Sequence, residues 1–134
     1  MQAYPHVLAS HDEAFWVPKK VFLSRFDQED FACRECLDVE QHYLDSWFYD
    51  DDEKRFFILP VVQIVGGKTQ FINGRHRLAV LLPHLDRFPV AFCFQSWGAP
   101  DHTKRQVAIE WGVEPMRSDI PFVLPNLPFV EFVE

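Results

Sequence analysis

The sequence predicts an α/β fold, in which a small and partly open mixed sheet is flanked by helices. Two long apolar runs, at 56–65 and 87–94, are typical of buried strands. A Gly-Gly pair at 66–67 predicts a tight hairpin that returns the chain along the first run. Segments with helical spacing of apolar residues alternate with the strands, at about 28–47, 75–84 and 102–111.

Length and composition predict one folded domain that spans residues 1–134. A chain of 134 residues should bury roughly two-thirds of its unfolded surface. Hydrophobic residues make up 48% of the chain and aromatic residues 16%, which excludes an intrinsically disordered chain. We expect the core of the domain at about 15–95 and an extended apolar tail at about 118–134.

The first segments of the chain are expected to be extended. Residues 1–14 are polar and are expected to form a loosely held arm. The apolar stretches 15–17 and 21–23 are expected to be strands, with Pro18 at an edge or at a strand start.

A long helix is predicted over about 28–47. Asp27 is its expected N-cap, and Asp30 follows three residues later as a variant of the capping box. One face carries apolar residues at spacings of four, three, four and four: Ala32, Cys36, Val39, Tyr43 and Trp47.

The later elements follow from turn and cap residues. Pro60 predicts a break within the run 56–65, and residues 68–72 are expected to return antiparallel after the Gly-Gly turn. The run 87–94 is expected to be a central strand. Asp101 is the expected N-cap of the helix over 102–111, and Gly112 is expected to end it.

The tail places three prolines among large apolar residues over 120–133. Proline excludes a regular helix, so the tail is expected to be extended. A tail this apolar would not stay exposed to water. Two placements stay open: a groove of its own domain, or a contact with another subunit in a homo-oligomer.

The segment Asn73-Gly74-Arg75-His76-Arg77, between a strand and a helix, is the predicted functional site. Gly74 lets the backbone approach a ligand or adopt a positive φ. The first amides of the helix have no partner within it and carry partial positive charge. Cationic side chains oppose this dipole, so packing alone does not explain their presence here. A bound anion, above all phosphate, would explain it.

A structural alternative stays open for the same segment. Arg75 and Arg77 could pair with the acidic run 50–53, while His76 could hydrogen-bond a backbone carbonyl. Structural ion pairs also produce such clusters.

The order of strand, Gly-Gly turn, strand and the residues Asn-Gly-Arg-His-Arg-Leu-Ala at 73–79 resembles the core of the ParB/sulfiredoxin superfamily. Its members carry a G-x-[HR]-R-type signature where a helix follows a hairpin. ParB-type partition proteins read like G-E-R-R there, and the stretch contributes to binding nucleotide phosphates. Related free serine kinases read like D-G-H-H-R. Sulfiredoxins read G-C-H-R with a catalytic cysteine; Arg75 stands at that position here, so sulfinic acid reduction is not expected.

The resemblance covers roughly residues 15–95 and implies a ParB/sulfiredoxin-like domain that binds a nucleotide or another phosphate ligand. Arg75 and Arg77 would clamp phosphate oxygens, and Gly74 would permit their approach. Asn73 would orient the turn or the ligand. His76 is the candidate catalytic residue, as hydrogen-bond donor or acid/base near neutral pH.

Phosphoryl transfer is one form of this hypothesis. It would use ATP or CTP with Mg²⁺ and would need a carboxylate near the phosphate. Asp27, Glu29 and Asp30 are the candidates. The alternative hypothesis is a non-catalytic interaction or assembly module that keeps the fold and assembles through its tail. A carboxylate within reach of the phosphate would distinguish the first from the second.

The sequence predicts no metal site. Cys33 and Cys36 lie within the predicted first helix, and no second ligand pair of zinc-site spacing accompanies them. The acidic run 50–53 is interpreted as a solvated loop.

Charge and targeting signals bear on partners and location. With 20 acidic and 13 basic residues the net charge is −7, which disfavours non-specific nucleic-acid binding. The chain is also too short to add the helical DNA-binding domain of full partition proteins. No apolar run approaches the length of a membrane span. With no visible signal peptide and three cysteines, the expected location is cytoplasmic.

Overall fold

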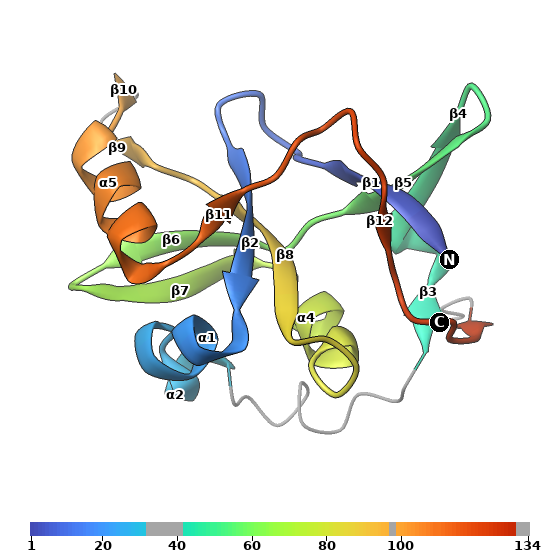
Figure 1. Ribbon diagram of the computed structural model, residues 1–134, viewed down its shortest axis with the longest axis horizontal. Helices are drawn as coiled ribbons and strands as arrows, with labels where there is room; N and C mark the ends of the chain where they lie inside the picture. The colour runs from blue at the N-terminus through green and yellow to red at the C-terminus, as the bar shows by residue number, and fades with distance from the viewer. Residues whose placement is uncertain (32–41, 97–98, 131–134) are drawn as a thin grey trace.

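The protein is a mixed α/β structure built around two larger sheets (Figure 1). The computed structural model describes residues 1–31, 42–96 and 99–130. A five-stranded sheet has the order β11-β2-β8-β6-β7, and a four-stranded sheet has the order β12-β1-β5-β4. The strand pairs β9–β10 and β3–β13 stand outside these sheets. The predicted α/β class with a mixed sheet is therefore confirmed at this level.

The described strands and helices have the following bounds. The strands are β1 Gln2–His6, β2 Glu13–Pro18, β3 Tyr43–Leu44, β4 Phe48–Asp51, β5 Lys54–Ile58, β6 Val61–Val65, β7 Lys68–Asn73, β8 Arg87–Phe92, β9 Gln95–Ser96, β10 Ala99–Pro100, β11 Glu114–Pro115, β12 Phe122–Val123 and β13 Phe129–Val130. The helices are α1 Lys19–Arg25, α2 Gln28–Phe31, the 3-10 helix η1 Asp45–Trp47, α4 Arg75–Leu81 and α5 His102–Trp111.

Strand β8 is the centre of the five-stranded sheet, as its apolar sequence predicts. It pairs antiparallel with β2 along its whole length and parallel with β6. Val90, Ala91 and Phe92 are fully buried because both faces of the strand are covered.

The run 56–65 divides at Pro60, as predicted. β5 joins the four-stranded sheet, and β6 joins the five-stranded one. The predicted hairpin then forms: β6 pairs antiparallel with β7, and Gly66 and Gly67 occupy the left-handed region with φ of 59° and 77°. One continuous apolar stretch therefore links the two sheets and leads into the Asn73–Arg77 segment.

The helices pack their apolar side chains into one core. α1, α2 and α4 gather in the lower half of Figure 1, and Val21, Phe22, Leu78 and Leu81 are buried in the common cluster. α5 confirms its predicted ends: the Asp101 carboxylate accepts hydrogen bonds from the first-turn amides, and Gly112 closes the helix at φ 107°. Across the described helices, none combines the length and apolar character needed to cross a membrane.

Two predictions for the N-terminal region are wrong. Residues 1–14 do not form a loose arm, because β1 pairs parallel with β5 and antiparallel with β12. Residues 21–23 are helical rather than extended. Pro18 is the N-cap of α1, and the Phe22 ring packs edge-on against Phe88 of the central strand. A short apolar run fits a strand or a helix equally, and burial against β8 selects the helix here.

The predicted helix over 28–47 is wrong at its C-terminal end. Asp27 does cap α2, since its Oδ1 accepts hydrogen bonds from the amides of Glu29 and Asp30. Residues 32–41 lie outside the described part of the chain. Residues 43–47 form β3 and η1, and Tyr43 is fully buried there. The tail pairs with β3 at this position.

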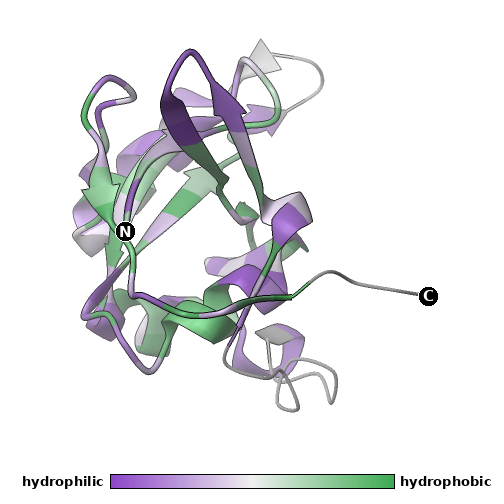
Figure 2. Ribbon diagram, turned by 90° about the vertical axis from the view of Figure 1, so that its right-hand side faces the viewer, coloured by the Kyte–Doolittle hydropathy of each residue, from purple (hydrophilic) through white to green (hydrophobic). Residues whose placement is uncertain are grey.

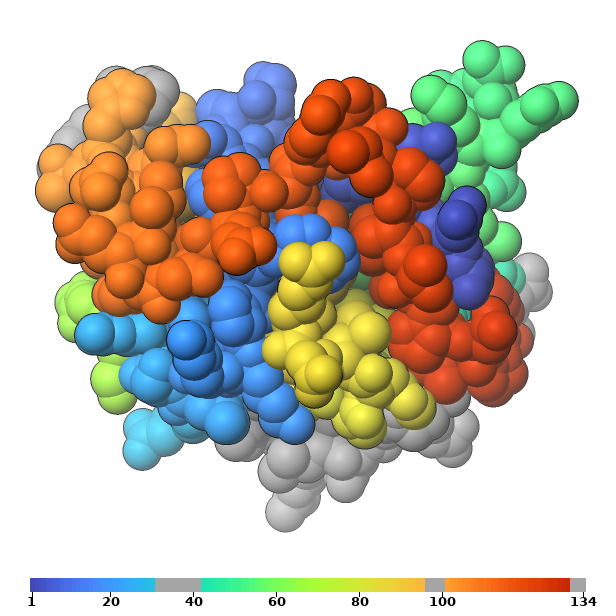
Figure 3. All heavy atoms as spheres, viewed as in Figure 1, coloured from blue at the N-terminus to red at the C-terminus, as the bar shows by residue number. Residues whose placement is uncertain are grey.

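The tail lies on its own domain, which is one of the two placements left open by the sequence. Figure 3 shows it as an orange-red band against the blue N-terminal residues. β12 pairs with β1, and Leu124 is buried. The terminal ammonium of Met1 donates to Leu124 O and to Asn126 Oδ1, each at 3.0 Å. Residues 131–134 lie outside the described part of the chain.

Replacing Tyr43 with phenylalanine is expected to lower the free energy of unfolding by about 1 kcal/mol at neutral pH. The Tyr43 hydroxyl donates to Pro125 O at 2.7 Å, and the variant leaves that carbonyl without its donor. Burial raises the pKa of Tyr43 to about 12, above its ordinary value.

The raised pKa gives this interaction a pH dependence. Between about pH 10 and 12 the unfolded state loses the Tyr43 proton while the folded state keeps it, so wild-type stability falls as pH rises. Tyr43→Phe lacks this loss. Urea unfolding of both proteins at pH 8 to 11 should therefore show their stability difference narrowing above about pH 10. A difference independent of pH would contradict the buried hydroxyl.

Candidate functional site

The Asn73–Arg77 segment joins the end of β7 to the start of α4. Asn73 pairs with Val61 at the end of the hairpin, and Gly74 is the N-cap of α4 at φ 94°. A Cβ at Gly74 would lie 2.6 Å from Arg77 Nη2 and 2.7 Å from Pro60 Cα. Only glycine fits this position, because the backbone is left-handed and the space is already filled.

The Arg77 guanidinium is buried beneath this turn. Arg77 retains 8% of its exposure, and its Nη2 donates one long hydrogen bond of 3.4 Å to Leu59 O. Its buried Nε has no hydrogen-bond partner. Burial lowers the pKa of Arg77 to about 10. In residues 1–31, 42–96 and 99–130, no carboxylate pairs with Arg77 to offset its buried positive charge.

Arg75 has a different environment from Arg77. Its Nη2 lies 2.6 Å from Asp30 Oδ1, and the other oxygen of Asp30 accepts a hydrogen bond of 2.8 Å from the Phe71 amide. Asp30 therefore ties α2 both to β7 and to the start of α4. The predicted capping-box role of Asp30 is wrong, because its carboxylate contacts these two residues instead.

Asn73 and His76 lie at the surface of the segment, and both side chains are exposed. Among the three candidate carboxylates, Asp30 reaches the segment through Arg75. Asp27 caps α2, and Glu29 is exposed on the same helix. The structure thus brings one of the three acids to the predicted site.

The acidic run 50–53 lies at the tip of the β4–β5 hairpin. Asp50 and Asp51 belong to β4, while Asp52 and Glu53 form the turn at φ 49° and 66°. This tip is hydrophilic in Figure 2 and projects away from α4 in Figure 1. The proposed pairing of this run with Arg75 and Arg77 is wrong. Arg75 forms its ion pair with Asp30, and Arg77 donates a hydrogen bond to the Leu59 carbonyl.

A cavity of about 260 Å³ touches the segment at Asn73. His11, Asp12 and Cys93 also line it, and sequence reasoning did not select these residues. Of two larger cavities, the one of about 520 Å³ also touches His11, and the one of about 780 Å³ is lined by other residues. The only local sign of this cluster in the sequence is the adjacent pair His11 and Asp12. Cys93 is distant in sequence and is brought to them only by the fold.

Comparison of the chain with protein-family models, curated proteins and solved structures finds no match. The chemistry of the site is therefore inferred from its own residues.

Proposed function

We propose that this protein binds a phosphate-bearing small molecule, with a nucleotide as the expected form, at the Asn73–Arg77 segment. One observation carries the proposal: Arg77 is a buried cation with no carboxylate partner among the described residues. Burying an unpaired charge is costly, and proteins ordinarily pair such a charge. A phosphate would supply the missing negative charge and hydrogen-bond acceptors.

The surroundings of Arg77 support an anionic ligand. Gly74 has no side chain to separate the guanidinium from the turn, and Asn73 and His76 offer exposed polar groups on the same segment. Arg75 would position the turn through Asp30 rather than act as the main phosphate clamp. The cavity at Asn73 is slightly below the range of about 300–1,000 Å³ typical of small-molecule sites. We therefore expect the phosphate, more than the base, to be enclosed.

The order of elements supports a ParB/sulfiredoxin-like domain. The Gly-Gly hairpin β6–β7 leads through the Gly74 turn into α4, which is the arrangement that the resemblance implies. Binding is favoured over phosphoryl transfer, because both oxygens of Asp30 already accept hydrogen bonds from Arg75 and Phe71. The tail gives less support to an assembly module, since Leu124 and the pairing of β12 and β13 place it on its own domain.

Calorimetric titration tests the proposal directly. ATP, ADP, CTP and inorganic phosphate are titrated with and without Mg²⁺ into wild type, Arg77→Met and Arg117→Met. Arg117 is the matched control, because it pairs with Asp119 at an exposed position. We expect saturable binding by wild type and the control, and binding weaker by about 100-fold or more in Arg77→Met.

Arg77→Met is expected to remain folded, since methionine fills similar space without a buried charge. Circular dichroism and urea unfolding check this. If folded wild type binds none of the four ligands at millimolar concentration, or if Arg77→Met binds as well as wild type, the proposal fails.

A further inference from the structure

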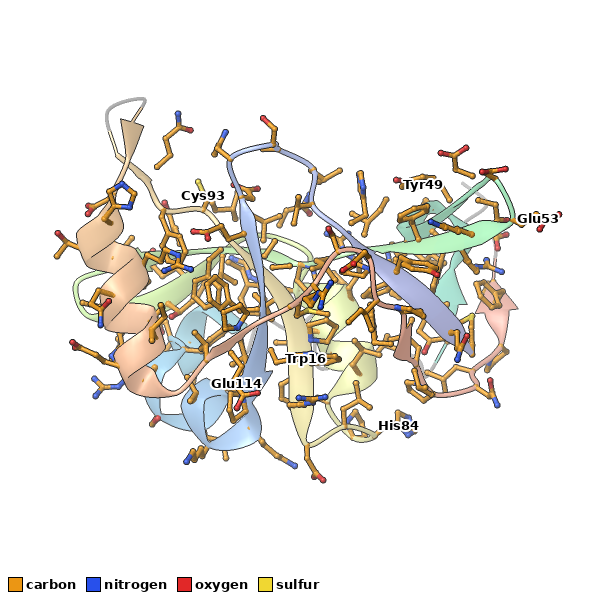
Figure 4. All side chains as sticks on the ribbon, turned by 45° about the horizontal axis from the view of Figure 1, so that its top comes forward. Trp16, Tyr49, Glu53, His84, Cys93 and Glu114 are labelled. Carbon is orange, nitrogen blue, oxygen red and sulfur yellow. The ribbon has the colours of Figure 1, made fainter. Side chains whose placement is uncertain are left out.

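Three potential metal ligands meet at the β1–β2 loop. His11 and Asp12 lie in that loop, and Cys93 follows the last residue of β8. One ligand atom from each residue lies within 4.8 Å of the others, and His11 Nε2 is 3.5 Å from Asp12 Oδ1. Figure 4 shows the Cys93 sulfur at the end of β8, on the side of this loop.

The Asp12 carboxylate is the second observation that points to a ligand. Its side chain is only 5% exposed, and its Oδ1 accepts no hydrogen bond. The nearby His11 nitrogen is close enough for a charge interaction but does not satisfy that oxygen as a hydrogen-bond donor. A buried carboxylate oxygen without a partner is costly, and a bound cation would remove that cost.

Backbone hydrogen bonds fix the main chain at two of the three ligand residues. The Asp12 amide donates to Ala9 O at 3.0 Å within the loop, and the Cys93 amide donates to Val62 O at 2.8 Å. His11 is more exposed, so its imidazole has room to adjust. Asp12 and Cys93 therefore project from backbone positions that are hydrogen-bonded, and the imidazole is the more exposed of the ligand groups on the loop.

We propose that His11, Asp12 and Cys93 bind a divalent transition metal ion, with Zn²⁺ as the best match. Thiolate, imidazole and carboxylate together are zinc ligands, whereas Mg²⁺ and Ca²⁺ prefer oxygen alone. Tetrahedral zinc with its usual bond lengths places ligand atoms about 3.3–3.7 Å apart. The distance of 3.5 Å between His11 Nε2 and Asp12 Oδ1 falls in this range.

Three protein ligands leave the fourth position of a tetrahedral ion open. All three residues line the cavity of about 260 Å³, so a water molecule or a ligand oxygen would complete the coordination there. Such a site activates water or polarises a bound oxygen. Asn73 lines the same cavity, so a ligand at the open position would lie in a cavity that borders the proposed phosphate segment.

Zinc binding can be measured on full-length, tag-free protein kept reduced with a phosphine. Zn²⁺ is titrated in competition with a chromophoric chelator, and Co²⁺ serves as the spectroscopic probe. We expect one Zn²⁺ per chain. With Co²⁺ we expect visible bands of tetrahedral intensity and a sulfur-to-cobalt charge-transfer band, which reports the Cys93 thiolate.

Variants assign the ligands. His11→Gln, Asp12→Asn and Cys93→Ser should each weaken Zn²⁺ binding by about 100-fold or more, since even the groups that orient a ligand matter by 10–100-fold. The controls are His102→Gln, an exposed histidine on α5, and the double variant Cys33→Ser/Cys36→Ser. Both controls should bind like wild type. His11 is exposed, so His11→Gln tests the site even if a change at the other two positions impairs folding.

The inference fails if reduced wild type binds no Zn²⁺. It also fails if binding survives undiminished in Cys93→Ser and His11→Gln, or if the cobalt charge-transfer band disappears in the Cys33→Ser/Cys36→Ser control instead. The zinc site does not depend on the phosphate proposal: Arg77→Met should retain full zinc affinity, so the two can fail separately.

Discussion

Replacing Gly74 with alanine is expected to lower the free energy of unfolding by about 2–5 kcal/mol. Two costs add. A left-handed alanine costs about 1–2 kcal/mol, and forcing a methyl group into filled space costs about 1–3 kcal/mol more. The new Cβ would lie 2.6 Å from Arg77 Nη2 and 2.7 Å from Pro60 Cα. Since the Pro60 backbone connects two sheets, it has little freedom to move away.

Gly67→Ala is the matched control for this effect. Gly67 also has a positive φ, of 77°, but a Cβ there would meet nothing within 4 Å. We expect the free energy of unfolding of the control to fall only by the cost of a left-handed alanine, about 1–2 kcal/mol. Urea unfolding of the two variants and wild type measures the difference. Equal losses in both variants would contradict the close packing of Arg77 beneath Gly74.

Replacing Asp30 with asparagine is expected to lower the free energy of unfolding by about 2–3 kcal/mol. Asp30 accepts a charge-assisted hydrogen bond from Arg75 Nη2 at 2.6 Å and another from the Phe71 amide at 2.8 Å. Asparagine loses the charge and offers only one acceptor. The interactions between α2, the edge strand β7 and the start of α4 would weaken together.

Glu29→Gln is the control, because Glu29 is exposed on the same helix. Glu29→Gln should change the free energy of unfolding by no more than about 0.5 kcal/mol, as for other surface changes. Urea unfolding of both variants gives the comparison, and hydrogen exchange at the Phe71 amide gives a local readout. Protection of that amide should fall in Asp30→Asn. Unchanged stability and unchanged protection would show that Asp30 does not hold the segment.

The elements that sequence reasoning predicted are those fixed by local chemistry. The Gly-Gly hairpin needs positive φ at two adjacent residues, and α5 carries its own cap at Asp101 and its own stop at Gly112. The central strand β8 is uniformly apolar. Each of these signals lies within the element itself.

The errors arose where distant residues decide the local structure. Residues 2–6 become a strand because β5 and β12 lie beside them. Residues 43–47 do not continue the predicted α-helix, because the tail pairs with β3 and its Pro125 carbonyl accepts a hydrogen bond from the Tyr43 hydroxyl. Neither partner is visible in the local pattern.

The candidate site shows the same division. The Gly74 turn between a strand and a helix followed from the sequence. The partners of its two arginines did not, because Asp30 and Leu59 reach them through the fold. The two arginines look equivalent in the sequence, but the Arg77 guanidinium is buried whereas Arg75 is partly exposed and pairs with Asp30. The cluster of His11, Asp12 and Cys93 was missed for the same reason.

The most direct measurement of the central proposal is the NMR signal of the Arg77 guanidinium during a titration with ATP and inorganic phosphate. Arg77→Met identifies the signal by its absence. We predict a saturable shift of the Arg77 Nε–Hε resonance, because phosphate would supply the partner that this buried group lacks. A resonance that does not move at saturating ligand, in folded protein, would contradict the assignment of Arg77 as the phosphate-binding cation.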